Sequence, residues 1–170
     1  GPSGCGKSTL LRIVAGLIKP TRGVVRLDGN VISGPGQDRG MVFQSYTLFP
    51  WLTVKENIQF GLEISGVPKA DQEQVAREFV EKVGLRGFEK AYPKGLSGGM
   101  KQRVAIARAL VNNPKIIFAD EPTGNLDSST GEAIMGILNR LHKEDGVAIL
   151  MVTHEDDLAR TANRLIRMKD

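Results

Sequence analysis

The residues best suited to chemistry stand at the start of the chain, where glycines surround a lysine and two hydroxyl side chains. The sequence opens Gly-Pro-Ser-Gly-Cys-Gly-Lys-Ser-Thr, which fits the pattern G-x-x-x-x-G-K-[ST] of a phosphate-binding loop. Glycines let the backbone curl around phosphates with its N–H groups pointing inward, at the positive end of the following helix. In such a loop the Lys7 ammonium would neutralise the β- and γ-phosphates, and the Ser8 hydroxyl would bind Mg²⁺. The predicted nucleotide-binding residues of this loop are Gly1, Pro2, Ser3, Gly4, Cys5, Gly6, Lys7, Ser8 and Thr9.

Two adjacent acids form a second candidate site. Asp120 and Glu121 follow the apolar run Ile-Ile-Phe-Ala, which predicts a buried strand, and ligands bind at the carboxyl ends of strands in open α/β sheets. Asp120 is placed to hold the Mg²⁺ shell, while Glu121 can face the γ-phosphate and polarise an attacking water. The alternative is an acidic strand end that caps the next helix. Together with the glycine-rich loop, the pair predicts hydrolysis of a nucleoside triphosphate.

A sheet and several helices must position these residues, and the apolar pattern predicts both. The predicted helices cover residues 7–17, 54–62, 72–83, 128–142 and 156–162, with another beginning just after residue 99. The predicted strands cover residues 23–27, 40–43, 115–119, 147–152 and 164–168, the first of them ending in a hairpin-type turn at Asp28-Gly29. Near-continuous apolar strands that alternate with helices indicate an α/β fold, here a P-loop NTPase core with a mostly parallel sheet covered on both faces.

The middle of the chain has a different character, because residues 52–113 read as helix without intervening strands. We expect them to form an α-helical subdomain inserted into a core made of residues 1–51 and 114–170. The whole chain of 170 residues has the length of one domain.

Composition narrows the class of protein. Hydrophobic residues make up 41% and charged residues 25% of the chain, as in soluble globular proteins, and no apolar run approaches the ~20 residues that span a bilayer. The net charge of +4 is spread along the chain, which gives little support for a nucleic-acid partner. The single cysteine, Cys5, excludes an internal disulfide framework and a multi-cysteine zinc site, and it fits a reducing cytosol.

A third motif, Leu-Ser-Gly-Gly-Met-Lys-Gln at residues 96–102, resembles the L-S-G-G-x-x-Q signature of the ATP-binding cassette (ABC) family. The resemblance implies that this segment opens a helix and binds the γ-phosphate of ATP held by an opposite subunit. Its chemistry agrees, since a hydroxyl, two glycines and a helix N-terminus favour an anion. By itself Ser-Gly-Gly is also an ordinary helix cap. The nucleotide-binding residues implied here are Ser97, Gly98, Gly99 and Gln102.

Three further markers of the family occur in order along the chain. Gln44, after the predicted strand 40–43, is similar to the glutamine that senses Mg²⁺ and the γ-phosphate; Asp127 is similar to the loop aspartate that crosses the dimer interface; His154 is similar to the histidine that contacts the γ-phosphate. Each also has a plain structural interpretation, as a surface glutamine, a helix-capping aspartate or a strand-end histidine. The resemblance implies catalytic roles for Lys7, Gln44, Glu121 and His154, nucleotide contacts from Gln44, Asp127 and His154, and a Mg²⁺ site at Ser8, Gln44 and Asp120.

The resemblance implies the ATPase subunit of a membrane transporter, at the cytoplasmic face of the membrane. Its partners would be a second copy in a head-to-tail dimer, transmembrane permease subunits and, for an importer, an extracytoplasmic solute-binding protein. The aromatic residues that follow Gln44, with Phe49 and Trp51 foremost, can form the floor of a permease-docking groove or pack in the core. A non-transport member acting on nucleic acid or ribosomes is the competing class. The compact helical segment and the single cysteine speak against it, so we expect no nucleic acid.

Two segments resemble different branches of the family. Phe-Pro-Trp-Leu-Thr-Val at residues 49–54 and Leu-Ser-Gly-Gly-Met resemble ATPases of nitrate, sulfonate and taurine importers. Residues 120–127, Asp-Glu-Pro-Thr-Gly-Asn-Leu-Asp, resemble lipoprotein-release and macrolide-export ATPases, since importers of the first group more often carry Phe and Ala in place of Thr123 and Asn125. We favour the importer, because a partner-facing segment should follow the partner more closely than a catalytic strand does.

The phosphate-binding loop stands at residue 1, although such a loop needs a buried strand leading into it. We therefore expect the sequence to be an N-terminally truncated slice of a larger domain, with the adenine-stacking aromatic also upstream. Without that strand, we expect a chain that folds poorly and hydrolyses little ATP.

Overall fold

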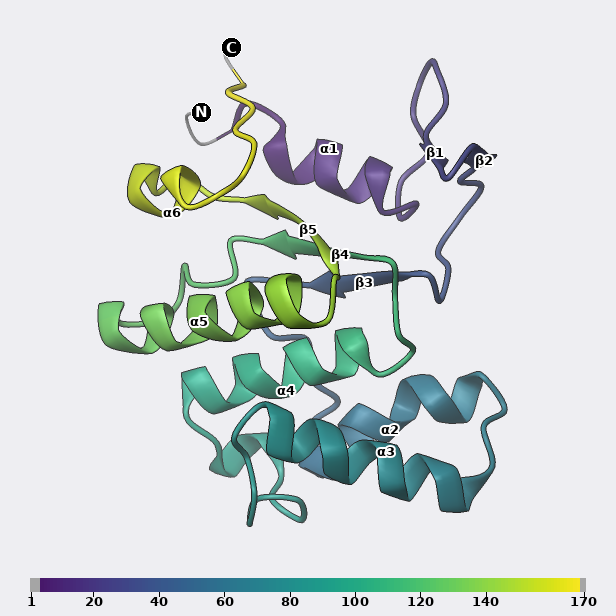
Figure 1. Cartoon of the computed structure of the whole chain (residues 1–170), viewed down its shortest axis with the longest axis vertical. Coiled ribbons are helices and arrows are strands. Elements are labelled where there is room, and N and C mark those ends of the chain that lie inside the picture. Colours follow the sequence, from purple (N-terminus) through teal and green to yellow (C-terminus); the bar gives the residue numbers. More distant parts are fainter. Residues whose placement is uncertain (1–3, 169–170) are drawn as a thin grey trace.

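Three parallel strands form the sheet at the centre of the molecule (Figure 1). The structure is a computed structural model and describes residues 4–168. The strands are β3 (Arg39–Val42), β4 (Ile116–Asp120) and β5 (Ala148–Val152), in the order β3-β4-β5. Met41 lies opposite Phe118, which in turn lies opposite Leu150. The predicted α/β class with a parallel sheet is thus confirmed, and the three carboxyl ends lie side by side.

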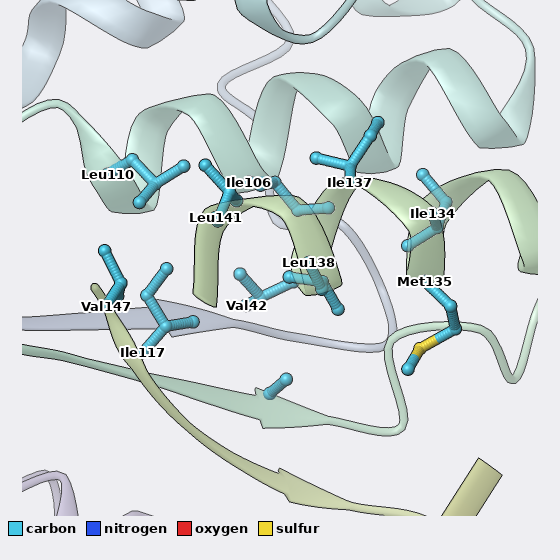
Figure 2. Packing of buried hydrophobic residues seen from close by; sticks show 11 residues of the cluster. Val42, Ile106, Leu110, Ile117, Ile134, Met135, Ile137, Leu138, Leu141 and Val147 are labelled. Atoms are coloured by element: carbon cyan, nitrogen blue, oxygen red, sulfur yellow. The ribbon is translucent and has the colours of Figure 1, made fainter. Parts of the chain in front are cut away.

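Helices cover both faces of this sheet (Figure 1). On one face α1 (Lys7–Val14) buries Leu11 and Ala15 against Phe118 of β4. On the other face lie α4 (Gly98–Leu110) and α5 (Ser128–Glu144). Figure 2 shows the apolar cluster between these two helices and the strands, which joins Val42, Ile106, Leu110, Ile117, Ile134, Met135, Ile137, Leu138, Leu141 and Val147. Burying this cluster fixes the sheet between its helix layers.

A second apolar cluster lies among α2 (Val54–Ile64), α3 (Lys69–Lys82) and α4, beyond the helix layer (Figure 1). The helix α2 starts with a capping box, in which the Thr53 hydroxyl accepts from the Glu56 N–H and the Glu56 carboxylate accepts from the Thr53 N–H. A 3-10 turn, η1 (Pro93–Gly95), leads into α4. Because α4 contributes to both clusters, it joins the helical layer to the sheet.

One buried polar side chain organises the chain that enters α2. Asn57 is fully buried, and its Oδ1 accepts from the Phe49 N–H at 2.9 Å. Its Nδ2 donates to the carbonyl oxygens of Phe49, Leu52 and Thr53 at 3.0–3.2 Å. The turn at residues 49–53 is therefore held to α2 by a satisfied buried amide.

The helix predicted at residues 7–17 ends earlier, at Val14. Gly16 adopts φ +81°, its N–H donates to the Ile13 carbonyl, and the Leu17 N–H donates to the Arg12 carbonyl. These two bonds form a Schellman motif, which closes a helix at a left-handed glycine. A Cβ at Gly16 would also meet the Gly34 carbonyl oxygen, so the position requires glycine on two grounds.

The hairpin-type turn is confirmed: Asp28 and Gly29 connect β1 (Arg26–Leu27) to β2 (Asn30–Val31), both with positive φ. The strand predicted at residues 23–27 is shortened to these two residues. The helix predicted at 156–162 is present as α6 (Asp156–Arg160). Among the residues that the structure describes, no helix is both long enough and apolar enough to cross a membrane.

The strand predicted at residues 164–168 is wrong. These residues have no regular secondary structure, and within residues 4–168 the sheet partner of β5 is β4 alone. Leu165 is 48% exposed and Ile166 is 73% exposed. An extended apolar segment becomes a strand only when a neighbour pairs with its backbone groups, and no segment within residues 4–168 pairs with it in this way.

Candidate active site

The glycine-rich loop leads into α1 through two left-handed residues. Gly4 and Gly6 have φ values of +89° and +87°, and Gly6 is the N-cap of α1 without any side-chain cap. The first turn of α1 therefore begins without a capping side chain, and the positive end of the helix attracts an anion. Lys7, Ser8 and Thr9 form this first turn. Gly1, Pro2 and Ser3, which were also predicted to bind nucleotide, lie outside the described residues.

The acidic strand end meets this turn. Ser8 Oγ donates to Asp120 Oδ1 at 2.7 Å, although the two residues are 112 positions apart in the chain. Asp120 is buried, and its other oxygen lies 3.8 Å from the Arg12 guanidinium. Hydroxyl and carboxylate oxygens are the donors that Mg²⁺ prefers, and Mg²⁺ at phosphoryl-transfer sites takes only one or two protein ligands. The pair of Ser8 and Asp120 therefore fits the predicted metal site.

Glu121 and His154 meet at the ends of neighbouring strands. His154 Nδ1 lies 3.1 Å from Glu121 Oε1, a distance at which an Nδ1–H donates to the carboxylate. The Glu121 N–H donates to the Val152 carbonyl, which ties the turn after β4 to the end of β5. Glu121 has φ +47°, a conformation that non-glycine residues adopt rarely and usually near functional sites. The carboxylate is thus held by backbone and side chain together.

Gln44 lies at the third strand end, two residues after β3. Its Nε2 donates to Asn125 Oδ1 at 3.4 Å, and Asn125 Nδ2 donates to the Gln44 carbonyl at 2.9 Å. A cavity of about 300 Å³ opens between this glutamine and the metal pair, lined by Ser8, Arg12, Phe43, Gln44, Ser45, Asp120 and Asn125. The structure therefore brings Ser8 of α1, Gln44 after β3 and Asp120 of β4 together around one cavity, while the Glu121–His154 pair follows β4 and β5 without lining it.

The motif at residues 97–99 lies elsewhere in the same chain. Ser97 is the N-cap of α4, and its hydroxyl accepts from the Met100 N–H at 3.3 Å. Because α4 and α1 cover opposite faces of the sheet (Figure 1), this motif does not join the cavity beside α1. Gly99 is buried, and a Cβ at this position would meet the Thr130 side chain. The two helices α4 and α5 therefore pack closely there. Residues 97–99 therefore form the N-terminus of α4, a helix that is held by its packing against α5.

Two other predicted residues have structural partners. Gln102 is fully buried, and its Nε2 donates at 2.7 Å to the carbonyl of Pro122, next to Glu121. Asp127 caps α5, accepting from the N–H and hydroxyl of Thr130 and the hydroxyl of Ser129. These hydrogen bonds hold the pKa of the Asp127 carboxyl well below its usual range.

Two residues that pair with predicted site residues were not themselves predicted to belong to the site. Arg12 lines the cavity and approaches Asp120, and Asn125 joins Gln44 to the turn after β4. The signal for Arg12 is its spacing, since it follows Ser8 by four residues and so lies on the same face of α1. Asn125 lies in the motif at residues 120–127, but no local pattern indicates that it pairs with Gln44.

A model of the family described as ABC transporter matches residues 1–124. The uncharacterized ABC transporter ATP-binding protein MJ0412 of Methanocaldococcus jannaschii is 54% identical over 159 residues, which cover 94% of this chain and 60% of that protein. The nitrate import ATP-binding protein NrtD of Synechocystis is 50% identical, over 91% of this chain and 58% of that protein. The taurine import ATP-binding protein TauB of Roseobacter denitrificans is 46% identical, over 99% and 63% respectively. The chain thus spans about three fifths of the length of these relatives.

The fold has close counterparts among solved structures. The ATP-binding cassette MJ0796, in a dimeric post-hydrolysis state bound to ADP and phosphate, superposes with a TM-score of 0.87 at 42% identity, covering 99% of this chain and 78% of that one. A second dimeric structure of MJ0796 gives 0.86 at 43% identity. The predicted P-loop fold is confirmed, and so is the resemblance to nitrate and taurine importer ATPases.

Proposed function

Because this chain belongs to the ABC transporter family, we propose that it is the ATP-hydrolysing part of an importer that works through a membrane permease. The observation that carries the proposal is the cavity shared by Ser8 of α1, Gln44 after β3 and Asp120 at the end of β4. Glu121, the residue after Asp120, pairs with His154 beyond the end of β5. The identity to nitrate and taurine import ATPases supports a small anionic or zwitterionic solute.

Phosphate binding is assigned to the loop and the start of α1. The backbone N–H groups around Gly6 and the Lys7 ammonium would bind the phosphate oxygens, as the helix dipole favours. Ser8 and Asp120 would hold Mg²⁺, which when bound neutralises the charge on the β- and γ-phosphates. Gln44 lines the same cavity and would complete this shell from the side of β3.

Hydrolysis needs a base, and Glu121 is the carboxylate in position. It would orient a water and accept its proton as the water attacks the γ-phosphate. The Nδ1–H of His154 holds the carboxylate now, and the same side chain is free to turn toward a phosphate because it is exposed. The hydrogen bond from Gln102 Nε2 to the Pro122 carbonyl attaches the turn beside Glu121 to α4.

Completion of the site is assigned to a second copy. Residues 97–99 form a helix N-terminus with the chemistry to bind a phosphate, but they lie across the sheet from the loop of their own chain. A head-to-tail dimer places them over the loop of the partner copy, with Asp127 and its neighbours near the interface. The dimeric state of MJ0796, which is 42% identical, supports this arrangement.

Docking to the permease is assigned to the aromatic residues after Gln44. Trp51 is 70% exposed, and its ring stacks at a tilt on Phe49, with centroids 5.7 Å apart. An exposed tryptophan on a braced turn is suited to fill a pocket of a partner. In this proposal residues 52–113 form the helical subdomain, the protein lies at the cytoplasmic face of the membrane, and a solute-binding protein delivers the solute.

The proposal is tested in proteoliposomes that contain the full-length protein and its permease. We expect ATP-dependent uptake of nitrate or taurine. The Lys7→Ala variant should lose ATP binding, whereas Glu121→Gln should bind ATP and lose turnover by about 100-fold or more. Export of a lipid-linked or macrolide substrate from these vesicles would replace the importer with the alternative transporter class. ATPase activity stimulated by nucleic acid or ribosomes, without transport, would contradict both.

A further inference from the structure

The chain leaving Gln44 passes through two strained residues. Tyr46 and Thr47 have φ values of +59° and +50°, although neither is glycine. The Thr47 N–H donates to the Ser45 carbonyl at 2.6 Å, so the turn is tight. Such a conformation is strained for a residue with a side chain and persists only where the surroundings hold it. Something outside the turn must therefore stabilise it.

Arg108 of α4 holds this turn with its guanidinium group. Its NH1 donates to the Thr47 carbonyl at 2.7 Å, and its NH2 donates to the Thr47 hydroxyl at 2.9 Å and to the Tyr46 carbonyl at 3.4 Å. The guanidinium also lies over the Phe49 ring, 5.6 Å from the centroid. A planar fork that donates to several acceptors and stacks on an aromatic ring is a property of arginine that lysine lacks.

The environment of Arg108 is unusual for a cation. Burial lowers the pKa of its guanidinium group, and within residues 4–168 no carboxylate forms an ion pair with it. The backbone carbonyls of the turn and the Phe49 ring are its compensating partners. Removing a partly desolvated cation from such acceptors leaves them unsatisfied, so the turn depends on this side chain.

The position of Arg108 joins two parts of the site. Arg108 lies near the C-terminal end of α4, the helix whose first turn carries residues 97–99. It donates a hydrogen bond to the carbonyl of Tyr46, two residues after Gln44. We propose that Arg108 is a positioning residue, which anchors residues 46–47 on α4 and thereby holds Gln44 at the cavity beside Ser8 and Asp120. This inference rests on the proposed function, because it concerns the same ATP site.

A double-mutant cycle tests the role. In the full-length protein with its permease, Arg108→Met should lower kcat for ATP by about tenfold and change KM by less than about twofold. In a Gln44→Ala background the same substitution should cost less than about twofold, because its effect passes through Gln44. An equal loss in both backgrounds would overturn the proposal. Arg103→Met is the control: it removes another arginine from α4, with one hydrogen bond to the Val83 carbonyl at 3.4 Å, and should leave kcat within about twofold.

Hydrogen exchange gives a second readout that needs no turnover. The amides of residues 45–48 should exchange about tenfold faster in Arg108→Met than in the wild type. Those of residues 49 and 51–53 should change little, because Asn57 holds this turn. Unchanged exchange at residues 45–48 would overturn the inference even in an active enzyme. Faster exchange in a protein whose wild type hydrolyses no ATP would support the anchor and contradict the proposed function. Should Arg108→Met fail to fold, Arg108→Lys, which keeps the charge and loses the guanidinium fork, and Thr47→Ala, which removes the hydroxyl that accepts from Arg108, should show smaller changes in the same direction.

Discussion

At the scale of single residues, Glu121 combines a strained backbone with the carboxylate proposed as base. Its φ of +47° is a conformation for which glycine has no steric cost. We expect Glu121→Gly to raise the free energy of unfolding by about 1 kcal/mol, while hydrolysis is lost. Urea denaturation of the full-length protein measures the first effect. Glu121→Gln, which keeps the side chain and the strain, should leave stability within about 0.5 kcal/mol of the wild type; a stability gain for Gln equal to that for Gly would show that strain is not the cause.

The residues that the sequence predicted best are those whose chemistry is local. The glycine-rich loop and the two acids follow from residue type and from the element beside them, and His154 follows from the family resemblance. The structure brings Ser8 to Asp120 and Glu121 to His154. Arg12, Asn125 and Arg108 could not be predicted in the same way. Their roles depend on contacts between distant segments, such as Asn125 with Gln44, 81 positions apart, and Arg108 with Tyr46, 62 positions apart. No local pattern encodes such a contact.

At the scale of elements, Asp127 shows how a helix cap makes stability depend on pH. Three hydrogen bonds from Ser129 and Thr130 lower the pKa of the folded-state carboxyl. The stability that they add is complete above the unfolded-state pKa of about 4 and is lost as the pH falls from there through the lower folded-state pKa. Asp127→Ala should therefore lower Tm at pH 7, and the gap to the wild type should shrink in acid.

Thermal unfolding of the full-length protein between about pH 2.5 and pH 7 checks this expectation. Asp127→Asn is the matched control, since it keeps an oxygen that can cap α5 but cannot titrate in this range. A gap between Ala and wild type that stays constant with pH would assign the stabilisation to some other group.

Element types were predictable because periodicity is local, whereas pairing is not. All three strands of the sheet and every predicted helix are present, with their ends moved by a few residues. The Gly16 motif that ends α1 lies within one turn of sequence and was available as a signal. The strand predicted at residues 164–168 had the right apolar pattern, yet a strand also needs a neighbour, and the pattern does not say which segment would provide one.

At the scale of the whole molecule, the proposed dimer predicts complementation between two inactive chains. Lys7→Ala disables the loop, and Ser97→Asp should keep the cap of α4 while its charge repels a phosphate. In a mixed dimer of these chains one site contains both defects and the other contains neither. We therefore expect about one ATP occluded per mixed dimer and none in either variant alone, measured with radiolabelled ATP after separation of the dimer by size.

The control mixes wild type with a chain that carries both substitutions, because every mixed dimer then has two defective sites. About one occluded ATP per mixed dimer in this control, with none in the complementing mixture, would mean that each chain binds ATP with its own residues 97–99. That result would contradict the head-to-tail arrangement while leaving the role of the loop intact.

The buried amide of Asn57 has a consequence for how such a protein can diverge. It uses one acceptor and both donor hydrogens on four backbone partners. Aspartate lacks the donors, glutamine is longer by a methylene, and leucine makes no hydrogen bonds. We therefore expect almost no other residue to be accepted at position 57 over evolutionary time. Trp51 is exposed on the turn that Asn57 holds, and it can be replaced at little cost to folding. A lineage could thus acquire a new membrane partner by changing a few side chains on an inherited loop, without redesigning the loop.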